Sequence, residues 1–119
     1  MSGDALERAR RICLALPQAY EQVAWGTPTW RVGKRLFAMF AGNHHSDGHV
    51  ALWLNAPLGL QEHLVADDPE RYFVPPYVGV KGWIGVEIGR APDDVLRAHV
   101  VESYSMVAPK KLLALLRDG

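Results

Sequence analysis

A two-residue break between two apolar runs constrains the fold of this chain more than any other feature. Residues 29–32 and 35–41 are rich in bulky apolar side chains, and only Gly33-Lys34 separates them. Such a break predicts an antiparallel β-hairpin, and glycine at its first position suits a type II′ turn. Trp30 would then lie opposite Phe37. Bulky side chains would share one face, namely Trp30, Val32, Phe37 and Met39, while Arg31 and Leu36 would share the other.

The flanking segments extend this hairpin into a sheet. Residues 18–25 and 49–54 are predicted as strands, with a corner at Gly26-Thr27-Pro28 because proline fixes its own φ and biases the residue before it toward extended geometry. A further strand is predicted at residues 83–88, and Lys81-Gly82 just before it predicts a second hairpin tip. We therefore expect a four-strand antiparallel meander followed by a later hairpin.

Four stretches with apolar residues at helical spacing predict helices around the sheet. The first has Asp4 as its expected N-cap and ends before Pro17. The others are expected to begin near prolines, which suit the first turn of a helix: Pro57, Pro92 and Pro109. Because 119 residues provide for one core, we predict a single α+β domain spanning residues 1–119, with the sheet flanked by N-terminal and C-terminal helices.

Composition limits the function classes. Thirteen basic residues balance thirteen acidic ones, whereas proteins that bind nucleic acid strongly and without sequence preference usually carry a basic surplus. The single Cys13 lies in the apolar register of the first helix, which predicts a buried, unreactive thiol and fits a cytoplasmic setting. We expect no secretory signal and no membrane span, because the chain has no sufficiently long apolar run.

Three motifs make the chain resemble the MmcQ/YjbR family of small bacterial cytoplasmic proteins. They are Trp25-Gly26-Thr27-Pro28-Thr29-Trp30-Arg31-Val32-Gly33, Lys81-Gly82-Trp83-Ile84-Gly85-Val86, and Ser103-Tyr104 before Ala108-Pro109-Lys110-Lys111. The resemblance covers nearly the whole chain and implies a curved antiparallel sheet flanked by helices, related to secretion-chaperone-like and frataxin-like folds. It also implies a double-wing arrangement and DNA binding, a function attached to the family by structural analogy. The two wings would be residues 31–35 and the tip at Lys81.

DNA binding would use cations at these tips and at the start of the last helix. The candidate phosphate contacts are Arg31, Lys34, Arg35, Lys81, Lys110 and Lys111. Lys110 and Lys111 fall in a first helical turn, where free backbone N–H groups favour an anion. Phosphate contacts position a protein without selecting a base sequence, so we expect weak, non-specific binding.

The alternative function is that of a protein- or small-ligand-binding module without catalysis. The segment 72–83 is rich in proline and aromatic residues, and an apolar groove could be lined by Tyr72, Phe73, Tyr77 and Trp83. The same segment would also serve as a connector packed on the sheet. By analogy with secretion chaperones, the protein would be a monomer or a homodimer.

The sequence contains few motifs typical of enzymes or of metal sites. The chain has no P-loop and no GxSxG motif, and its lone cysteine is poorly placed for a nucleophile, so we expect no catalysis and no cofactor. The one metal-like spacing joins His44, His45 and His49 around Asp47. Turn-forming residues surround these histidines, so an ordinary loop is the preferred interpretation.

Overall fold

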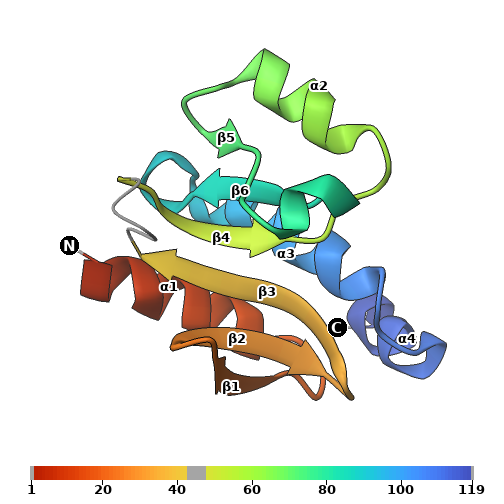
Figure 1. Ribbon diagram of the computed structural model, residues 1–119. Coiled ribbons are helices and arrows are strands. Elements are labelled where there is room, and N and C mark those ends of the chain that lie inside the picture. The colour runs from red at the N-terminus through yellow and green to blue at the C-terminus, as the bar shows by residue number, and fades with distance from the viewer. Residues whose placement is uncertain (1, 43–47, 119) are drawn as a thin grey trace.

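Six antiparallel strands form one open sheet in the order β1-β2-β3-β4-β6-β5 (Figure 1). The computed structural model describes residues 2–42 and 48–118. The strands are β1 Tyr20–Ala24, β2 Thr27–Val32, β3 Arg35–Gly42, β4 Val50–Leu54, β5 Tyr72–Phe73 and β6 Ile84–Glu87. The α+β class is confirmed, and so is the meander of four strands followed by a later hairpin, whose second strand β6 pairs with β4.

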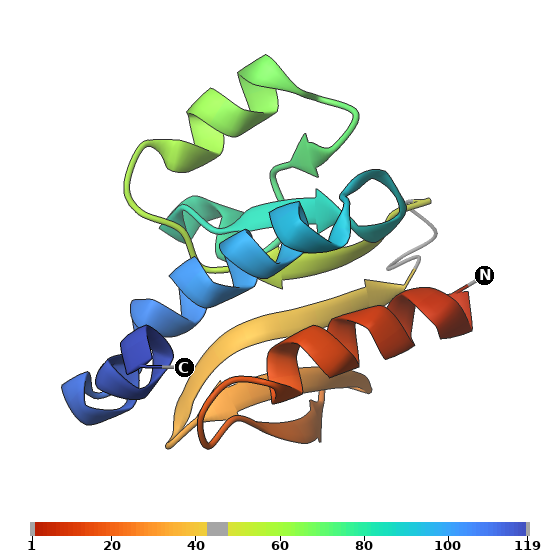
Figure 2. The ribbon, with the colours of Figure 1, turned by 180° about the vertical axis from the view of Figure 1, so that it is seen from behind.

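Four α-helices surround this sheet in the described residues. They are α1 Ser2–Leu14, α2 Leu60–Asp67, α3 Asp93–Ser105 and α4 Lys110–Asp118. Figure 2 shows α1 and α3 lying side by side across one face, while α2 lies at the β5 edge. Helix α1 begins at Ser2, so Asp4 lies within its first turn and is not its N-cap. In the described part of the chain, no helix is both long and apolar enough to cross a bilayer.

The helix-covered face holds the main hydrophobic core. Trp30, Phe37 and Tyr104 are fully buried there, and the rings of Phe37 and Tyr104 meet edge to face with centroids 5.4 Å apart. Ser103 ties α3 to the sheet, because its Oγ donates to the carbonyl oxygen of Phe37 at 2.5 Å and accepts from the backbone N–H of Asn55 at 2.9 Å. This packing fixes the position of β3.

The Gly33-Lys34 turn is confirmed. Val32 pairs with Arg35 across it, and only Gly33 of the two turn residues has a positive φ (+59°), as a type II′ turn requires. The predicted pairing further along the hairpin is wrong. Arg31 pairs with Leu36 as expected, but Trp30 pairs with Ala38, so one extra residue on β3 forms a β-bulge at Phe37.

The bulge changes which face each residue of β3 occupies. Phe37 and Ala38 both pack in the helix-covered core, and alternation resumes after them. Met39 therefore lies on the opposite face, not beside Trp30 and Phe37 as alternation without a bulge predicts. Here it joins a second apolar cluster with Ala41, Ala51, Trp53 and Trp83.

Two predicted turns also differ from the structure. The β1–β2 turn is Trp25-Gly26, with Ala24 paired to Thr27, so Pro28 belongs to β2 and forms no corner. Lys81-Gly82 is not a tight hairpin tip. The 3₁₀ helix η2, Val78–Lys81, ends at Lys81, and Gly82 is its C-cap. Both residues lie within the long connection between β5 and β6.

Candidate functional site

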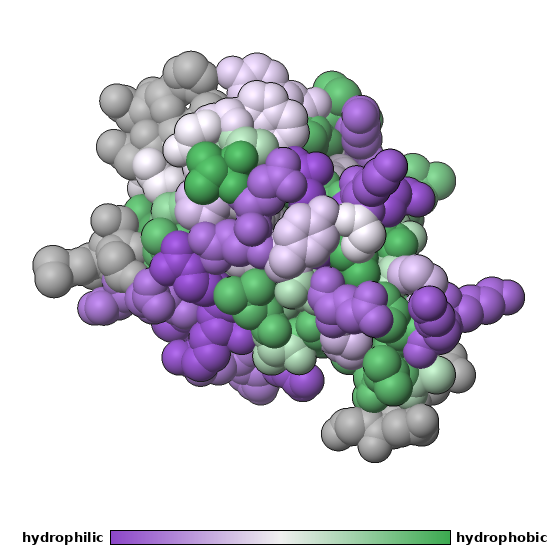
Figure 3. All heavy atoms as spheres, turned by 90° about the horizontal axis from the view of Figure 1, so that it is seen from below, coloured by the Kyte–Doolittle hydropathy of each residue, from purple (hydrophilic) through white to green (hydrophobic). Residues whose placement is uncertain are grey.

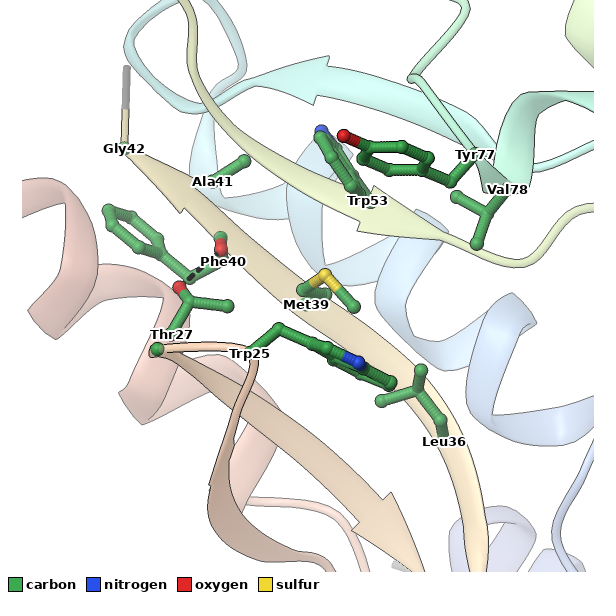
Figure 4. Close-up of a pocket in the computed structure, with 11 residues that line it drawn as sticks. Trp25, Thr27, Leu36, Met39, Phe40, Ala41, Gly42, Trp53, Tyr77 and Val78 are labelled. Atoms are coloured by element: carbon green, nitrogen blue, oxygen red, sulfur yellow. Dashed lines mark hydrogen bonds between the residues drawn. The ribbon is translucent and has the colours of Figure 1, made fainter. Parts of the chain in front are cut away.

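An apolar groove lies on the face of the sheet that α1 and α3 leave uncovered. Its volume is about 590 Å³, within the size range of small-molecule sites. The principal lining residues are Trp25, Leu36, Met39, Trp53, Tyr77 and Val78. Figure 4 shows Trp25 and Leu36 on one side, Trp53, Tyr77 and Val78 on the other, and Met39 between them on β3. We refer to this cavity as the aromatic groove.

Trp25 lies at the groove because it is part of the β1–β2 turn, in a backbone conformation that tryptophan rarely adopts. Trp25 and Gly26 are the two turn residues, and both have positive φ, +54° and +74°, as in a type I′ turn. Bulky residues rarely adopt this conformation, which favours Asn or Gly. The indole is nevertheless 76% exposed, so burial of this ring offsets little of the backbone strain.

Tyr77, across the groove, has an equally unusual backbone. Its φ of +63° and ψ of −65° are those of the strained form of the γ-turn. The turn is closed by the N–H of Val78, which donates to the carbonyl oxygen of Pro76 at 2.7 Å. Tyr77 is 69% exposed. Of the three non-glycine residues with positive φ in the described chain, two are thus exposed aromatic residues on opposite sides of one cavity.

The groove is held in shape by hydrogen bonds around it. The amide of Gln61, buried on α2, donates to the carbonyl oxygens of Gly79 at 2.8 Å and Trp83 at 2.6 Å, which fixes η2 above the sheet. On the other side, the Thr27 hydroxyl donates to the carbonyl oxygen of Phe40 at 2.6 Å (Figure 4). The cavity is therefore largely preformed, as ligand sites usually are.

The groove lining consists mainly of apolar and aromatic side chains, with hydroxyl groups on Thr27 and Tyr77. Among the described residues that line the groove, none carries a carboxylate, imidazole or thiol. The titratable groups with displaced pKa values lie elsewhere. Burial raises the pKa of the Cys13 thiol, and burial lowers the pKa of His99, whose Nε2 lies 2.7 Å from the Tyr72 hydroxyl. Among the described lining residues, the Tyr77 phenol is the side chain that could take part in general acid–base chemistry.

Only Tyr77 of the four expected groove residues lines the cavity. Tyr72 is buried on the helix-covered side, where it contacts His99. The Phe73 ring stacks on the His49 ring, with their centroids 3.8 Å apart, and it lies directly over Gly85. Trp83 is buried beneath η2 in the second apolar cluster.

The other groove residues were missed because they are far apart in sequence. Trp53 and Met39 meet only when β3 and β4 pair, and the bulge decides the face on which Met39 lies. Trp25 did carry a signal, since a Trp-Gly pair between two predicted strands places a bulky ring in a turn.

The six candidate cations do not form one flat surface. Lys34 and Arg35 are exposed at the β2–β3 turn, and Lys110 and Lys111 are exposed at the start of α4. Figures 1 and 2 place both elements at the same end of the molecule. Helix α4, however, packs on the helix-covered core, whereas η2 with Lys81 covers the opposite face. The β2–β3 turn can therefore act with α4 or with Lys81, but a single flat surface cannot include all three.

The lower surface of the molecule has hydrophilic areas interspersed with apolar patches (Figure 3). Val23 of β1 and Leu115 of α4 are among the exposed apolar side chains. Much of the charge of α1 is neutralised by ion pairs. Arg8 and Arg11 pair with Asp93 at 2.7 and 2.9 Å, and Arg10 pairs with Glu21 at 2.7 Å. The hydrogen bond from Arg10 lowers the pKa of Glu21, and that from Arg8 lowers the pKa of Asp93.

The histidine candidates lead to no metal site in the described residues. His44 and His45 lie outside those residues, while His49 contacts the Glu87 carboxylate through Nδ1 and stacks on Phe73. Within residues 2–42 and 48–118, no cluster of three His, Cys, Asp or Glu side chains could hold a metal ion.

Comparison with known proteins identifies the family. The fold is similar to the crystal structure of the Deinococcus radiodurans protein DR2400, which carries a DUF419 domain. The TM-score is 0.73 at 22% sequence identity, over 89% of this chain and 80% of that chain, a likeness that shows the fold alone. No curated protein sequence matches this chain. The YjbR family model matches residues 14–106, so the resemblance seen in the sequence motifs is confirmed, and this chain belongs to the YjbR family.

Proposed function

We propose that this protein is a non-catalytic binding module that takes a small molecule with an apolar body into the aromatic groove. One observation carries the proposal: Trp25 and Tyr77 hold exposed rings on opposite sides of the cavity, and both have strained backbone. Such strain costs on the order of 1–3 kcal/mol per residue and is concentrated at functional sites. A ligand that covered both rings would bury the apolar surface that they leave in water.

A small molecule fits the groove better than an extended peptide does. Peptides that bind sheets usually add a strand to an open edge. The groove lies over β3 and β4, and both edges of each of these strands are already paired within the sheet. The cavity volume of about 590 Å³ is that of a site for a compact ligand.

Titration with the neutral dye Nile red tests this proposal. We expect saturable binding with a rise in dye fluorescence, and a loss of at least tenfold in affinity in the double variant Trp25→Asn/Tyr77→Gly. Both substitutions suit positive φ, so the fold should persist. Leu58→Ser is the matched control, because Leu58 is fully exposed and does not line the groove. The proposal fails if the wild type binds no dye, or if the double variant binds as tightly as the control.

Weak DNA binding is a second candidate function, and the distribution of ion pairs favours it. The arginines at positions 8, 10, 11, 71 and 90 all pair with carboxylates. In the described chain no ion pair is found for the six candidate cations, so positive charge remains uncompensated at the β2–β3 turn and at α4. This candidate includes the cytoplasmic location and the monomeric or homodimeric state that the family resemblance implies.

Fluorescence anisotropy with a labelled duplex tests this second candidate. Binding should be detectable at low salt, fall as salt rises, and disappear in Lys34→Glu/Arg35→Glu. Arg90→Glu/Arg97→Glu is the matched control, since it changes the net charge equally at exposed positions away from the turn. Absence of binding at low salt would reject the DNA function, and equal loss in both variants would reject the assigned contacts.

A further inference from the structure

We infer that the ligand of the aromatic groove is an amphipathic anion whose carboxylate is bound by Arg31 and Lys81. This inference rests on the proposed function of the groove and adds the chemical class of its ligand. It follows from the cations that the fold places beside one end of the cavity.

Arg31 lies on β2 next to the groove, beside the lining residues and not among them. Trp30 and Val32 point into the helix-covered core, so alternation places Arg31 on the opposite face, where Thr27 of the same strand lines the groove. Its cross-strand partner is Leu36, another lining residue. Side chains of directly paired residues lie about 5 Å apart at Cβ, so the stem of Arg31 runs beside the Leu36 end of the cavity.

Arg31 is a partly buried residue, and no ion pair joins its guanidinium to a carboxylate in the described chain. Its Nε donates to the Thr29 hydroxyl at 3.3 Å, which orients the group and leaves both terminal nitrogens available. A partly desolvated charge without a counter-ion is unfavourable, and a planar guanidinium accommodates a carboxylate through two parallel hydrogen bonds. An anion bound here would therefore give the guanidinium a counter-ion.

Lys81 approaches the same end from the other side. A 3₁₀ helix has three residues per turn, so Lys81 lies on the same side of η2 as Val78, which lines the groove. Figure 4 shows Leu36 and Val78 at one end of the cavity, with Gly42 at the other. Two cations thus flank one end, while Phe40 and Ala41 make the opposite end apolar.

This asymmetry sets the orientation of the ligand. The apolar body would lie over Met39, between the Trp25 indole and the rings of Trp53 and Tyr77, and the carboxylate would face Arg31. No acidic side chain among the described lining residues opposes it. An aryl or alkyl carboxylate has this combination of parts, whereas a neutral apolar molecule would leave both cations without a partner.

Competition against Nile red tests the inference with two matched compounds, naphthylacetate and the neutral alcohol naphthylethanol. We expect the carboxylate to displace the dye at a concentration about 10- to 100-fold lower than the alcohol does, as for a charge-assisted contact. Arg31→Gln should remove most of this preference without changing the affinity for the alcohol. Lys81→Gln should remove a smaller part, and Arg31→Lys should retain some of it.

Lys34→Gln is the matched control, because it removes an exposed cation from the neighbouring turn residue. A thermal melt of each variant verifies that it is folded. If Nile red binds but both compounds compete equally, or if Arg31→Gln keeps the full preference, the anion assignment is wrong while the groove remains. If Nile red does not bind the wild type, the groove proposal fails and this inference fails with it.

Discussion

The two faces of the sheet use the same strands but bury their side chains to different degrees. On the helix-covered face, Trp30, Phe37 and Tyr104 are fully buried beneath or within the helices. On the groove face, η2 covers only part of the apolar cluster, and Trp25 and Tyr77 remain 76% and 69% exposed. Both faces are apolar, so hydrophobicity alone does not distinguish structural from functional positions. The two faces differ in exposure and in backbone strain, and the proposed function of the groove rests on that difference.

The largest expected effect is on the helix-covered face. Phe37→Ala should lower the free energy of unfolding by about 3–5 kcal/mol, because it removes a fully buried ring and its contact with Tyr104. Urea unfolding followed by circular dichroism measures this loss. Trp25→Ala, the corresponding change on the groove face, should alter stability by about 1 kcal/mol or less, since the indole is mostly exposed. Equal losses would contradict the contrast between the faces.

Removal of the bond between α3 and the sheet should have the next largest effect. Ser103→Ala leaves the buried carbonyl of Phe37 and the N–H of Asn55 without this partner, at a cost of about 1–3 kcal/mol. Ser105→Ala is the matched control, because the Ser105 hydroxyl donates only to Val101 of its own helix, at 2.7 Å. In urea unfolding, the free energy of unfolding should fall clearly more in Ser103→Ala than in Ser105→Ala. A loss in Ser105→Ala as large as that in Ser103→Ala would argue against a specific role for the bond.

The helix-covered face should also be the more sensitive one to pH. Burial lowers the pKa of His99 below its usual 6.5, so the unfolded chain binds a proton first as the pH falls. Stability contributed by neutral His99 is therefore present above pH 6.5 and is lost between 6.5 and the folded pKa, with a slope of at most about 1.4 kcal/mol per pH unit. Urea unfolding between pH 5 and pH 8 should show this slope in the wild type and a reduced slope in His99→Gln. An unchanged slope would assign the pH dependence to other groups.

The smallest expected effect is on the groove face, where a substitution should raise the free energy of unfolding and not lower it. Trp25→Asn creates an Asn-Gly pair, which suits a type I′ turn, so stability should rise by about 1 kcal/mol as strain is released. Trp25→Val should lower stability instead, because a β-branched residue tolerates positive φ poorly. Differential scanning calorimetry of the two variants tests the sign. A fall in stability in Trp25→Asn would show that the indole stabilises the fold more than its turn strains it.

Local signals in the sequence predicted most of the fold. The Gly33-Lys34 turn, the strands β4 and β6, and the helices after Pro92 and Pro109 are all present, because each depends on neighbouring residues. The bulge at Phe37 could not be predicted in this way. It depends on how β3 meets α3 and Tyr104, which are distant in sequence.

The candidate site was less predictable for the same reason. The aromatic residues of segment 72–83 are evident in the sequence, but the sequence does not say which of their rings face the groove. Tyr72 and Trp83 became core residues, and Tyr77 alone was directed outward by its γ-turn. The Trp25 side of the cavity comes from a hairpin whose turn was expected one residue later.

The bulge in β3 also bears on how relatives of this chain should be aligned. A relative with one residue fewer between the positions of Gly33 and Ala41 would keep its helices, its turn and its strand order. Its Met39 equivalent would also stay on the groove face, because removal of the extra residue restores regular alternation from Leu36 and leaves Thr29 opposite Met39. Within the YjbR family, such a chain should therefore be aligned with a one-residue gap at Phe37, since a gap placed elsewhere in β3 would exchange groove positions with core positions.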